Sequence, residues 1–425
     1  KTHFLSTFTA ISLLLPITVC LLIHLTASEI CRKLDDTSTI LRTNRQAFLS
    51  ITEGAEKFGL ELFTKISDAA GNEDFMISPF SVWALLLLLV EAASGSTLNE
   101  LRTVLHITED RQSLRQAFNV VQQFLQRKTS TVQVENLQAM YYDAYEQVGE
   151  DYKSTLMTCY SARVQHLNFN NTKITVNAIN NAINTETKGL ITNAITEDYV
   201  KDANLLLTST LYFKGQWQYP FNKSDTHRET FYDMNGLPIG EVDMMFQMTP
   251  FNYTRLPELQ GHVLELPYGN ENRLCMLVVL PNKGISVNQV VHNLQTLGVR
   301  SIFRKLEEDA LGFDEQEVEV YLPRFNTATT FPLRGSLEQL GLREIFNPQL
   351  VNFDILSKRL FVKDVVQTTK IIVNEEGTEA AAVATAILTN KISPPKFYFN
   401  RPFLYLIAEK RSNSLLFAGQ IANPQ

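Results

Sequence analysis

The sequence lacks the residue patterns that usually indicate enzyme or metal chemistry. It contains no Gly-x-Ser-x-Gly, His-Glu-x-x-His or Cys-x-x-Cys motif, no phosphate-binding Walker loop and no dinucleotide glycine fingerprint. Its histidines are few, and those of the main part of the chain occur without neighbouring ligand residues: His106, His166, His227, His262 and His292. We therefore expect no catalytic centre, no metal site and no cofactor of these kinds.

An excess of positive charge is also missing. The 425 residues include 38 Lys and Arg against 45 Asp and Glu, which gives a formal net charge of −7. Without a broad basic surface, we expect no binding to nucleic acid or to anionic membranes. No repeat and no Pro/Gly-rich linker divides the chain, and its length allows one large core. We therefore predict a single domain over residues 48–425, preceded by a polar arm over 29–47.

The first residues have the features of a secretory signal peptide. An apolar run from Ala10 to Ala27 follows Lys1 and ends in small residues that suit cleavage. A retained membrane anchor is the alternative, but Pro16 and the shortness of the apolar run disfavour it. We predict a signal peptide over residues 1–28, and hence a secreted, extracellular protein with no membrane attachment in its mature form.

Cysteines are scarce, and their spacing implies neither a disulfide framework nor a metal site. Cys20 falls in the predicted signal peptide, which leaves Cys31, Cys159 and Cys275, an odd number. Cys31 lies in the polar arm and is interpreted as a free or intermolecular thiol. The other two have apolar neighbours and are expected to be buried.

Three Asn-x-Ser/Thr sequons would accept glycans in a secreted protein. They begin at Asn170, Asn222 and Asn252. Glycosylation at these positions is therefore an expectation that depends on secretion.

Apolar periodicity predicts helices early in the chain and mainly strands later. Apolar residues recur every three or four positions from Phe48 to Ile66, and four more segments are typical of helices: 82–93, 98–105, 114–126 and 176–187. Runs rich in β-branched and aromatic residues predict strands at 205–213, 262–268, 275–281, 318–325, 370–375 and 403–409. This order favours a mixed α and β fold over a regular doubly wound one.

One unusually long connection, residues 377–396, separates two predicted strands. A connection of this length inside a compact domain is usually functional, disordered or misassigned. In a strand, alternate residues of its sequence GTEAAAVATAILTNK would lie on opposite faces, and one of these faces is small or apolar. The other face carries Glu379, the only charge before the lysine. No proline interrupts Thr378 to Lys391, so every residue there could donate to a sheet ladder, whereas Pro394 and Pro395 could not. The segment has the properties of a strand held out of its sheet.

Motifs around this connection and far from it occur together in a specific order. VNEEGTEAAAVATA precedes and enters the connection, and FYFNRPF follows it. Six more motifs are FMISPFSV, INNAINTETKGLI, LYFKGQW, VYLPRF, LEQLGLREIF and LLFAGQIANP. In these segments the chain resembles the serpins, a family of serine protease inhibitors, over nearly all of its predicted mature length. The resemblance implies about three mainly antiparallel sheets, about eight or nine helices and an exposed reactive-centre loop over 377–396.

The resemblance also implies inhibition by a suicide mechanism, and therefore a protein that is not itself an enzyme. A protease attacks the loop as a substrate and forms an acyl-enzyme. The cleaved loop then inserts into the large sheet and carries the tethered protease with it. The fourteen steps from Gly377 to Lys391 correspond to a displacement of roughly 45 Å at about 3.3 Å per residue. Deformed catalytic geometry then stalls deacylation.

The family's register implies which bond is cleaved. The residue before the scissile bond lies fourteen places after the hinge glycine and eight places before Phe399, and both counts give Lys391. Cleavage is therefore expected at Lys391–Ile392, where a lysine suits the specificity pocket of trypsin-like proteases. The expected partner is such a protease, held in a covalent complex by a monomeric inhibitor. Ile392 departs from the small or polar residue common at this position, which leaves the cognate enzyme open.

Further residues acquire expected roles in loop insertion through the resemblance. The hinge corresponds to Glu375, Glu376, Gly377, Thr378, Glu379, Ala380, Ala381 and Ala382. Ser78, Ser81 and Trp217 match the region over which the sheet opens. Ser209 and Gln367 belong to the same region but replace an asparagine and a histidine of many serpins. Because both side chains can hydrogen-bond, a polar latch is still expected there.

Two alternatives concern partners. A non-inhibitory serpin would act as a carrier, storage or interaction protein, but its hinge usually contains bulky, charged or proline residues, whereas this hinge is small almost throughout. Some serpins use a glycosaminoglycan cofactor, for which the candidates here are Arg102, Arg111, Arg115, Arg127 and Lys128. Such a sparse basic set is more typical of a solvated helix surface.

Overall fold

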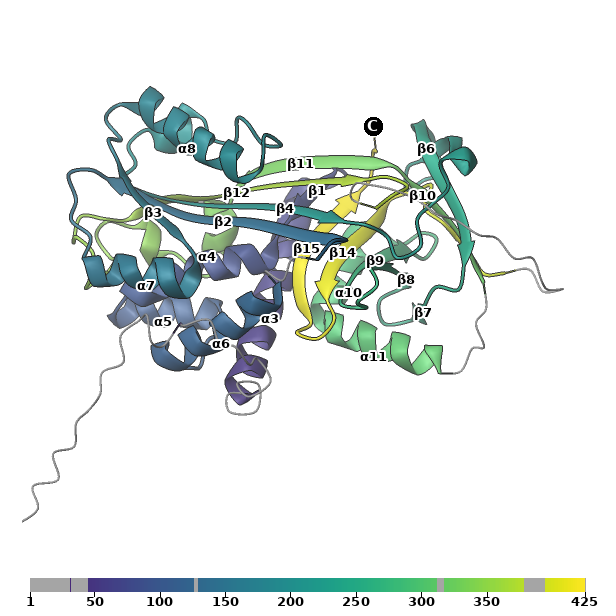
Figure 1. Cartoon of the computed structure of the whole chain (residues 1–425), viewed down its shortest axis with the longest axis horizontal. Coiled ribbons are helices and arrows are strands. Elements are labelled where there is room, and N and C mark those ends of the chain that lie inside the picture. Colours follow the sequence, from purple (N-terminus) through teal and green to yellow (C-terminus); the bar gives the residue numbers. More distant parts are fainter. Residues whose placement is uncertain (1–30, 32–44, 126–128, 312–316, 378–393, 425) are drawn as a thin grey trace, which may run out of the picture.

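The computed structural model describes Cys31 and residues 45–125, 129–311, 317–377 and 394–424. In these ranges the chain forms ten α-helices, two short 3₁₀ helices and fifteen strands in three sheets (Figure 1). Most neighbouring strands are antiparallel, which confirms the predicted mixed fold, with slightly more helices than the eight or nine expected. The predicted signal peptide lies outside the described residues.

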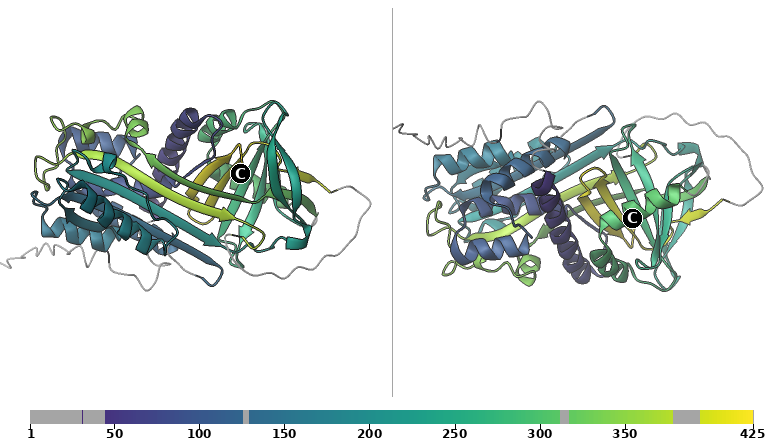
Figure 2. Two further views of the ribbon diagram at one scale, coloured as in Figure 1. Left: turned by 90° about the horizontal axis from the view of Figure 1, so that it is seen from above. Right: turned by 90° about the horizontal axis from the view of Figure 1, so that it is seen from below.

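The five-stranded sheet extends along the upper part of the molecule in Figure 1, in the order β11-β12-β4-β2-β3. Its strands are β2 (Val132–Asp143), β3 (Arg163–Leu167), β4 (Leu205–Gly215), β11 (Phe325–Pro332) and β12 (Val362–Val373). At its centre β12 and β4 are parallel neighbours, and they run side by side in both views of Figure 2. Helix α8 (Thr172–Glu186) covers one face of the sheet, and α4 (Pro79–Ala92) lies against the other.

Two further sheets form the rest of the described β-structure. The six-stranded sheet contains, in spatial order, β1 (Phe75–Ile77), β15 (Ser414–Ile421), β14 (Phe403–Glu409), β9 (Leu274–Pro281), β8 (Gly261–Tyr268) and β7 (Tyr253–Leu256). The four-stranded sheet contains β13 (Lys396–Tyr398), β10 (Val318–Pro323), β6 (Pro238–Thr249) and β5 (His227–Tyr232). Since β13 begins just after the predicted reactive loop, that loop connects the five-stranded sheet to the four-stranded one.

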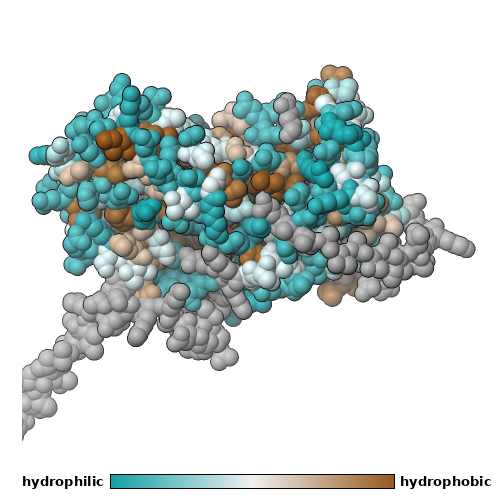
Figure 3. All heavy atoms as spheres, turned by 45° about the horizontal axis from the view of Figure 1, so that its top comes forward, coloured by the Kyte–Doolittle hydropathy of each residue, from teal (hydrophilic) through white to brown (hydrophobic). Residues whose placement is uncertain are grey.

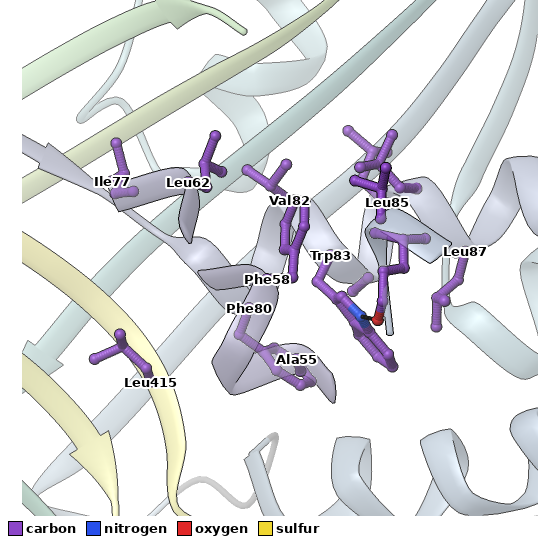
Figure 4. Packing of buried hydrophobic residues seen from close by; sticks show 14 of the residues in the cluster. Ala55, Phe58, Leu62, Ile77, Phe80, Val82, Trp83, Leu85, Leu87 and Leu415 are labelled. Atoms are coloured by element: carbon purple, nitrogen blue, oxygen red, sulfur yellow. Dashed lines mark hydrogen bonds between the residues drawn. The ribbon is translucent and has the colours of Figure 1, made fainter. Parts of the chain in front are cut away.

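Helix α4 is the centre of the helical layer. All fourteen of its residues are buried, as expected of a helix that is apolar on every side, and Pro79 occupies its first turn, where no N–H is needed. Trp83 donates its indole N–H to the carbonyl oxygen of Leu105 at 2.9 Å (Figure 4). The other α-helices are α3 (Arg45–Ala70), α5 (Gly95–Val104), α6 (Arg111–Leu125), α7 (Glu150–Tyr160), α9 (Glu197–Val200), α10 (Val287–Leu297), α11 (Val299–Ala310) and α12 (Arg334–Gln339). The 3₁₀ helices are η1 (Lys223–Asp225) and η2 (Glu344–Phe346).

The structure changes some predicted elements. The strand predicted over 318–325 is two strands in different sheets, because Pro323 ends β10 without an N–H to donate and Phe325 begins β11. The strand predicted over 370–375 begins earlier and ends at Val373. Strands β2 and β3 lie among the early helices, where no strand was expected. Helix α3 begins at Arg45, inside the predicted polar arm.

The interpretation of Cys31 as a free or intermolecular thiol is wrong. Cys31 is bonded to Cys159 on α7, with a Cα–Cα distance of 5.1 Å across a sequence separation of 128 residues. No sequence spacing indicates a pair so far apart, because only folding brings the two cysteines together. Cys159 and Cys275 are buried, as predicted, and Cys275 is a free thiol.

The described surface is largely hydrophilic, with scattered apolar patches (Figure 3). Exposed apolar residues include Ile174 on α8 and Leu237 between β5 and β6. Among the described residues, no helix is both long enough and apolar enough to cross a membrane.

Candidate functional site

The chain leaves β12 through a tight turn whose geometry requires glycine. Asn374 and Gly377 exchange two backbone hydrogen bonds of 3.0 and 3.2 Å. Gly377 has φ +121°, and a Cβ atom at this position would lie 2.2 Å from the carbonyl oxygen of Gly215. A side chain here would meet both a disfavoured backbone conformation and a direct clash with main-chain atoms. The resemblance predicted the hinge glycine at this position. Its role as a hinge stays a prediction, and the structure supplies a physical reason for glycine.

The same turn is attached to the chain segment that follows β4. The backbone N–H groups of Trp217 and Phe221 donate to the carbonyl oxygens of Glu376 and Glu375, at 3.1 and 2.8 Å. The Trp217 indole N–H also donates to the carbonyl oxygen of Asn374 at 3.0 Å. Its ring stacks on Tyr268, with the centroids 4.4 Å apart. Trp217 therefore holds the turn by both its main chain and its side chain.

The buried Glu375 carboxylate pairs with the exposed Arg324 guanidinium beside the turn. Glu375 is 1% exposed, and its Oε1 accepts hydrogen bonds from Arg324 Nε at 2.7 Å and from Thr226 Oγ1 at 2.5 Å. Burial by itself raises the pKa of this carboxyl, but the hydrogen bonds from Arg324 and Thr226 and the charge of Arg324 hold the pKa below its ordinary value. The next residue, Glu376, pairs with exposed Lys223 at 2.5 Å. Both hinge glutamates therefore have cationic partners in this state.

The two strands beside the hinge form the parallel pair at the centre of the sheet. Their pairing extends from Val362 and Leu205 to Lys370 and Tyr212, and no ladder pair joins β12 to β4 beyond that point. A segment that leaves β12 and reverses direction at Gly377 would run antiparallel to β12, and hence also antiparallel to β4. Insertion between them would replace one parallel interface with two antiparallel ones, which are slightly more stable per residue.

A row of polar side chains crosses the three central strands. Gln138 on β2, Ser209 on β4 and Gln367 on β12 are partners in register. Gln367 accepts a hydrogen bond from the Ser78 N–H at 2.8 Å and donates one to the Ser78 carbonyl oxygen at 2.9 Å. Ser209 Oγ has no hydrogen-bond partner in the described part of the chain. Of the two residues predicted to form a polar latch, Gln367 thus binds the backbone of Ser78 just before α4, and the role of Ser209 and Gln367 as a latch stays a prediction.

Ser81 completes the contacts between α4 and this row. Its carbonyl oxygen accepts a hydrogen bond from Gln138 Nε2 at 3.0 Å, and its hydroxyl donates to Asn136 Oδ1 at 3.3 Å. Both Ser78 and Ser81 are buried. The sheet-opening residues identified by resemblance thus lie together between α4 and the sheet, except for Trp217, which lies at the hinge.

Most of the predicted loop lies outside the described residues. This applies to the hinge residues Thr378, Glu379, Ala380, Ala381 and Ala382 and to the reactive bond Lys391–Ile392. Their roles stay predictions. Sequence reasoning did not identify Arg324 and Thr226 as the partners of Glu375. The arginine directly after the apolar strand VEVYLP was a signal that could have been used.

The predicted modification and cofactor residues occupy different surroundings. Asn170, Asn222 and Asn252 are all exposed. The basic residues on the early helices are partly engaged within the protein: Arg102 donates to the Glu109 carbonyl oxygen, Arg111 to those of Val90 and Ala93, and Arg115 to the buried Glu91 carboxylate. Arg127 and Lys128 lie outside the described residues. A glycosaminoglycan site here stays a prediction.

Comparison with known proteins finds the same fold along nearly the whole chain. A family model described as Serpin (serine protease inhibitor) matches residues 53–424. Serine protease inhibitor 2 of Anopheles gambiae is 30% identical over 369 residues, which cover 83% of this chain and 88% of that protein. The crystal structure of Serpin48, a highly specific serpin of the insect Tenebrio molitor, has a TM-score of 0.74 at 25% identity and covers 87% of this chain and 97% of its own. Human thyroxine-binding globulin has a TM-score of 0.78 at 22% identity and covers 89% and 100%.

Proposed function

Because the chain belongs to the serpin family, we propose that it is a secreted suicide inhibitor of trypsin-like serine proteases, cleaved at Lys391–Ile392. The family includes inhibitory members and non-inhibitory relatives such as thyroxine-binding globulin, so the inhibitory role needs support from this chain itself. That support comes from the hinge and from the central strand pair of the five-stranded sheet.

One observation carries the proposal: β12 and β4 are parallel neighbours, and the predicted loop leaves β12 through a reversing turn at Gly377. If this ladder opened, a strand inserted between β12 and β4 would pair with antiparallel geometry on both sides. The small residues after the hinge and the lack of proline up to Lys391 suit a segment that must become such a strand.

The chemical steps follow from ordinary acyl transfer. The protease serine attacks the carbonyl carbon of Lys391, its proton passes to the protease histidine, and the bond to the Ile392 nitrogen breaks as that nitrogen takes the proton. An ester then joins Lys391 to the protease, while the chain beginning at Ile392 is left with a free amine and keeps its strands β13, β14 and β15 in their sheets. Insertion of the loop would pull the ester and the protease away before water completes hydrolysis, because small displacements of reacting groups slow acyl transfer strongly.

Secretion is supported by the cysteine chemistry of the described chain. A disulfide such as Cys31–Cys159 persists in oxidising compartments and is rare in the cytosol. The three sequon asparagines are exposed, as glycan acceptors must be. Both observations agree with the predicted signal peptide.

Incubation with trypsin followed by denaturing electrophoresis tests the proposal. We expect a covalent band at the summed mass of the two proteins less that of residues 392–425, which separate as a small peptide under denaturing conditions. Changing Lys391 to Ala should abolish this band, whereas Lys391→Arg, which preserves the positive charge, should retain it. A loop that is cleaved without any covalent band would instead favour the non-inhibitory alternative, a carrier, storage or interaction protein.

A further inference from the structure

An open pocket of about 530 Å³ lies among β7, β8, β9 and β13, on the side of the chain that follows the predicted reactive bond. Its walls include three rings, those of Tyr253, His262 and Phe397. The Phe397 ring is buried, and its centroid lies 5.6 Å from that of Tyr253 and 6.4 Å from that of His262, with edge-to-face geometry in both pairs. The pocket therefore has a packed aromatic wall.

The charge of this pocket is opposite to that of the whole chain. Its ten lining residues include four Lys or Arg and no Asp or Glu: Arg255, Lys283, Lys396 and Arg401. Two of the four cations are engaged. Arg401 donates to the Pro281 carbonyl oxygen at 2.6 Å, and the Lys396 ammonium lies 3.8 Å from the Glu319 carboxylate and 4.2 Å from the ring centroid of Tyr321. Arg255 and Lys283 are exposed, and within the described ranges their side chains have no hydrogen bond or ion pair.

The titration of His262 agrees with a positive field in the pocket. Burial lowers the pKa of His262, and the charges of Arg255 and Arg401 lower it further. Concave sites lined by charge of one sign focus their field and attract partners of the opposite sign. The pocket is therefore suited to carboxylate groups, with aromatic surface available for the rest of the occupant.

The position of the pocket indicates which partner would reach it. Pro395 lines the pocket and follows Ile392 by three residues, a distance of at most about 11 Å along an extended chain. A standard protein interface covers about 800 Å² on each partner, which corresponds to a patch roughly 16 Å in radius. A protease centred on the Lys391–Ile392 bond would therefore extend over the pocket.

We propose that this pocket receives an acidic surface loop of the protease that attacks Lys391–Ile392, an inference that rests on the proposed inhibitory function. The carboxylates of the loop would pair with Arg255 and Lys283, and its apolar atoms would pack on the aromatic wall. Because complementary charge mainly accelerates encounter and selects partners, the pocket would set which trypsin-like proteases are inhibited fastest. The covalent trap itself would not depend on it.

Binding of a labelled peptide tests the pocket separately from inhibition. The probe is a fluorescein-labelled peptide of five acidic residues and one tyrosine, added to the intact protein at low salt and followed by anisotropy. The double variant Arg255→Ala/Lys283→Ala should bind it at least about fivefold more weakly than wild type, in keeping with the loss of two charge pairs. The matched control is Lys201→Ala/Lys358→Ala, which removes two exposed lysines outside the pocket and should bind like wild type. Equal binding by both double variants would overturn the proposal, as would tight binding of a small aromatic carboxylate without the peptide.

Inhibition kinetics then test the consequence for partners. For proteases with an acidic loop beside the active site, the pocket variant should form the covalent complex about three- to tenfold more slowly than the control, with a weaker dependence on salt. For proteases with a neutral or basic loop there, the two rates should be equal. If the variants do not differ with any protease, the docking proposal is wrong although inhibition stands. If wild type forms no covalent complex with any trypsin-like protease, the proposed function fails, while peptide binding still reports on the pocket.

Discussion

Gly377 and Glu375 fix the end of β12 by different physical means. Gly377 supplies a backbone conformation and a close approach to Gly215 that a residue with a Cβ atom cannot reach without strain. Glu375 supplies a buried carboxylate that is stable only because Arg324 and Thr226 donate to it. The glycine and the glutamates were recognisable in the sequence by resemblance. Their partners were not, because Arg324 and Thr226 come from distant parts of the chain.

Replacing Gly377 with Ala should destabilise the native state by about 1–3 kcal/mol, since both the positive φ and the contact with Gly215 become unfavourable. Urea unfolding followed by fluorescence measures the change. The control is Gly236→Ala, at φ +80° with no atom within 4 Å of the added Cβ, which isolates the backbone cost alone. Equal losses in the two variants would show that the close approach to Gly215 carries no energy.

The Glu375 ion pair should make hinge stability depend on pH. Because the pKa of Glu375 in the folded protein lies below its ordinary value of 4.5, its stabilising effect is present above pH 4.5 and is lost as the pH falls through the lower, folded-state pKa. Glu375→Gln should therefore lower the melting temperature at pH 7 but flatten its fall as the pH drops below 4.5. Melting curves of both proteins across this range measure the effect, and parallel curves would contradict it.

At the scale of elements, the proposed insertion of the loop depends on the direction of β12 and β4 as much as on their residues. They are adjacent and parallel, and the polar row of Gln138, Ser209 and Gln367 lies between them and the start of α4. Strands were predicted over 205–213 and 370–375; the first lies wholly in β4, and only residues 370–373 of the second lie in β12. Periodicity could not predict that the two strands are neighbours, because strand partners are chosen by burial of whole faces across the sheet.

Replacing Ala382 with Pro should turn the protein from an inhibitor into a substrate. Proline cannot donate to a sheet ladder, so insertion would stop before the acyl-enzyme is displaced. With trypsin, electrophoresis should show a cleaved loop and little or no covalent band. The conservative variant Ala382→Ser keeps the N–H and a small side chain, and it should form the covalent complex like wild type. A normal covalent yield from the proline variant would mean that inhibition does not require insertion of this segment.

At the scale of the whole molecule, the Cys31–Cys159 bond connects the region before α3 to the helical layer at α7. The two residues are separated by 128 positions, so the bond closes a large loop of the unfolded chain. Loops of this size give cross-links a large entropic effect on the unfolded state, whereas the sequence alone offered no reason to pair these cysteines. The pairing of Cys31 therefore depends on how the whole molecule packs.

Loss of this bond should reduce the free energy of unfolding by about 2–4 kcal/mol. We expect Cys31→Ser and Cys159→Ser to melt at the same lowered temperature, and a reductant to lower the melting temperature of wild type but of neither variant. The control is Cys275→Ala, which removes the buried free thiol of β9 and should keep the response to reductant. A wild-type melting temperature that does not respond to reductant would contradict the bond.

The sequence by itself determined the family, the mixed fold, the longest helices and several of the strands. These depend on local periodicity and on motifs that are contiguous in the chain. The tertiary structure decided the disulfide partner of Cys31, the ion pair of Glu375 with Arg324, the contact of Gln367 with Ser78 and the basic pocket that follows the reactive bond. The physical reason is the same in each case: these features join side chains from distant segments, which come within hydrogen-bonding or bonding distance only after the sheets and helices have packed.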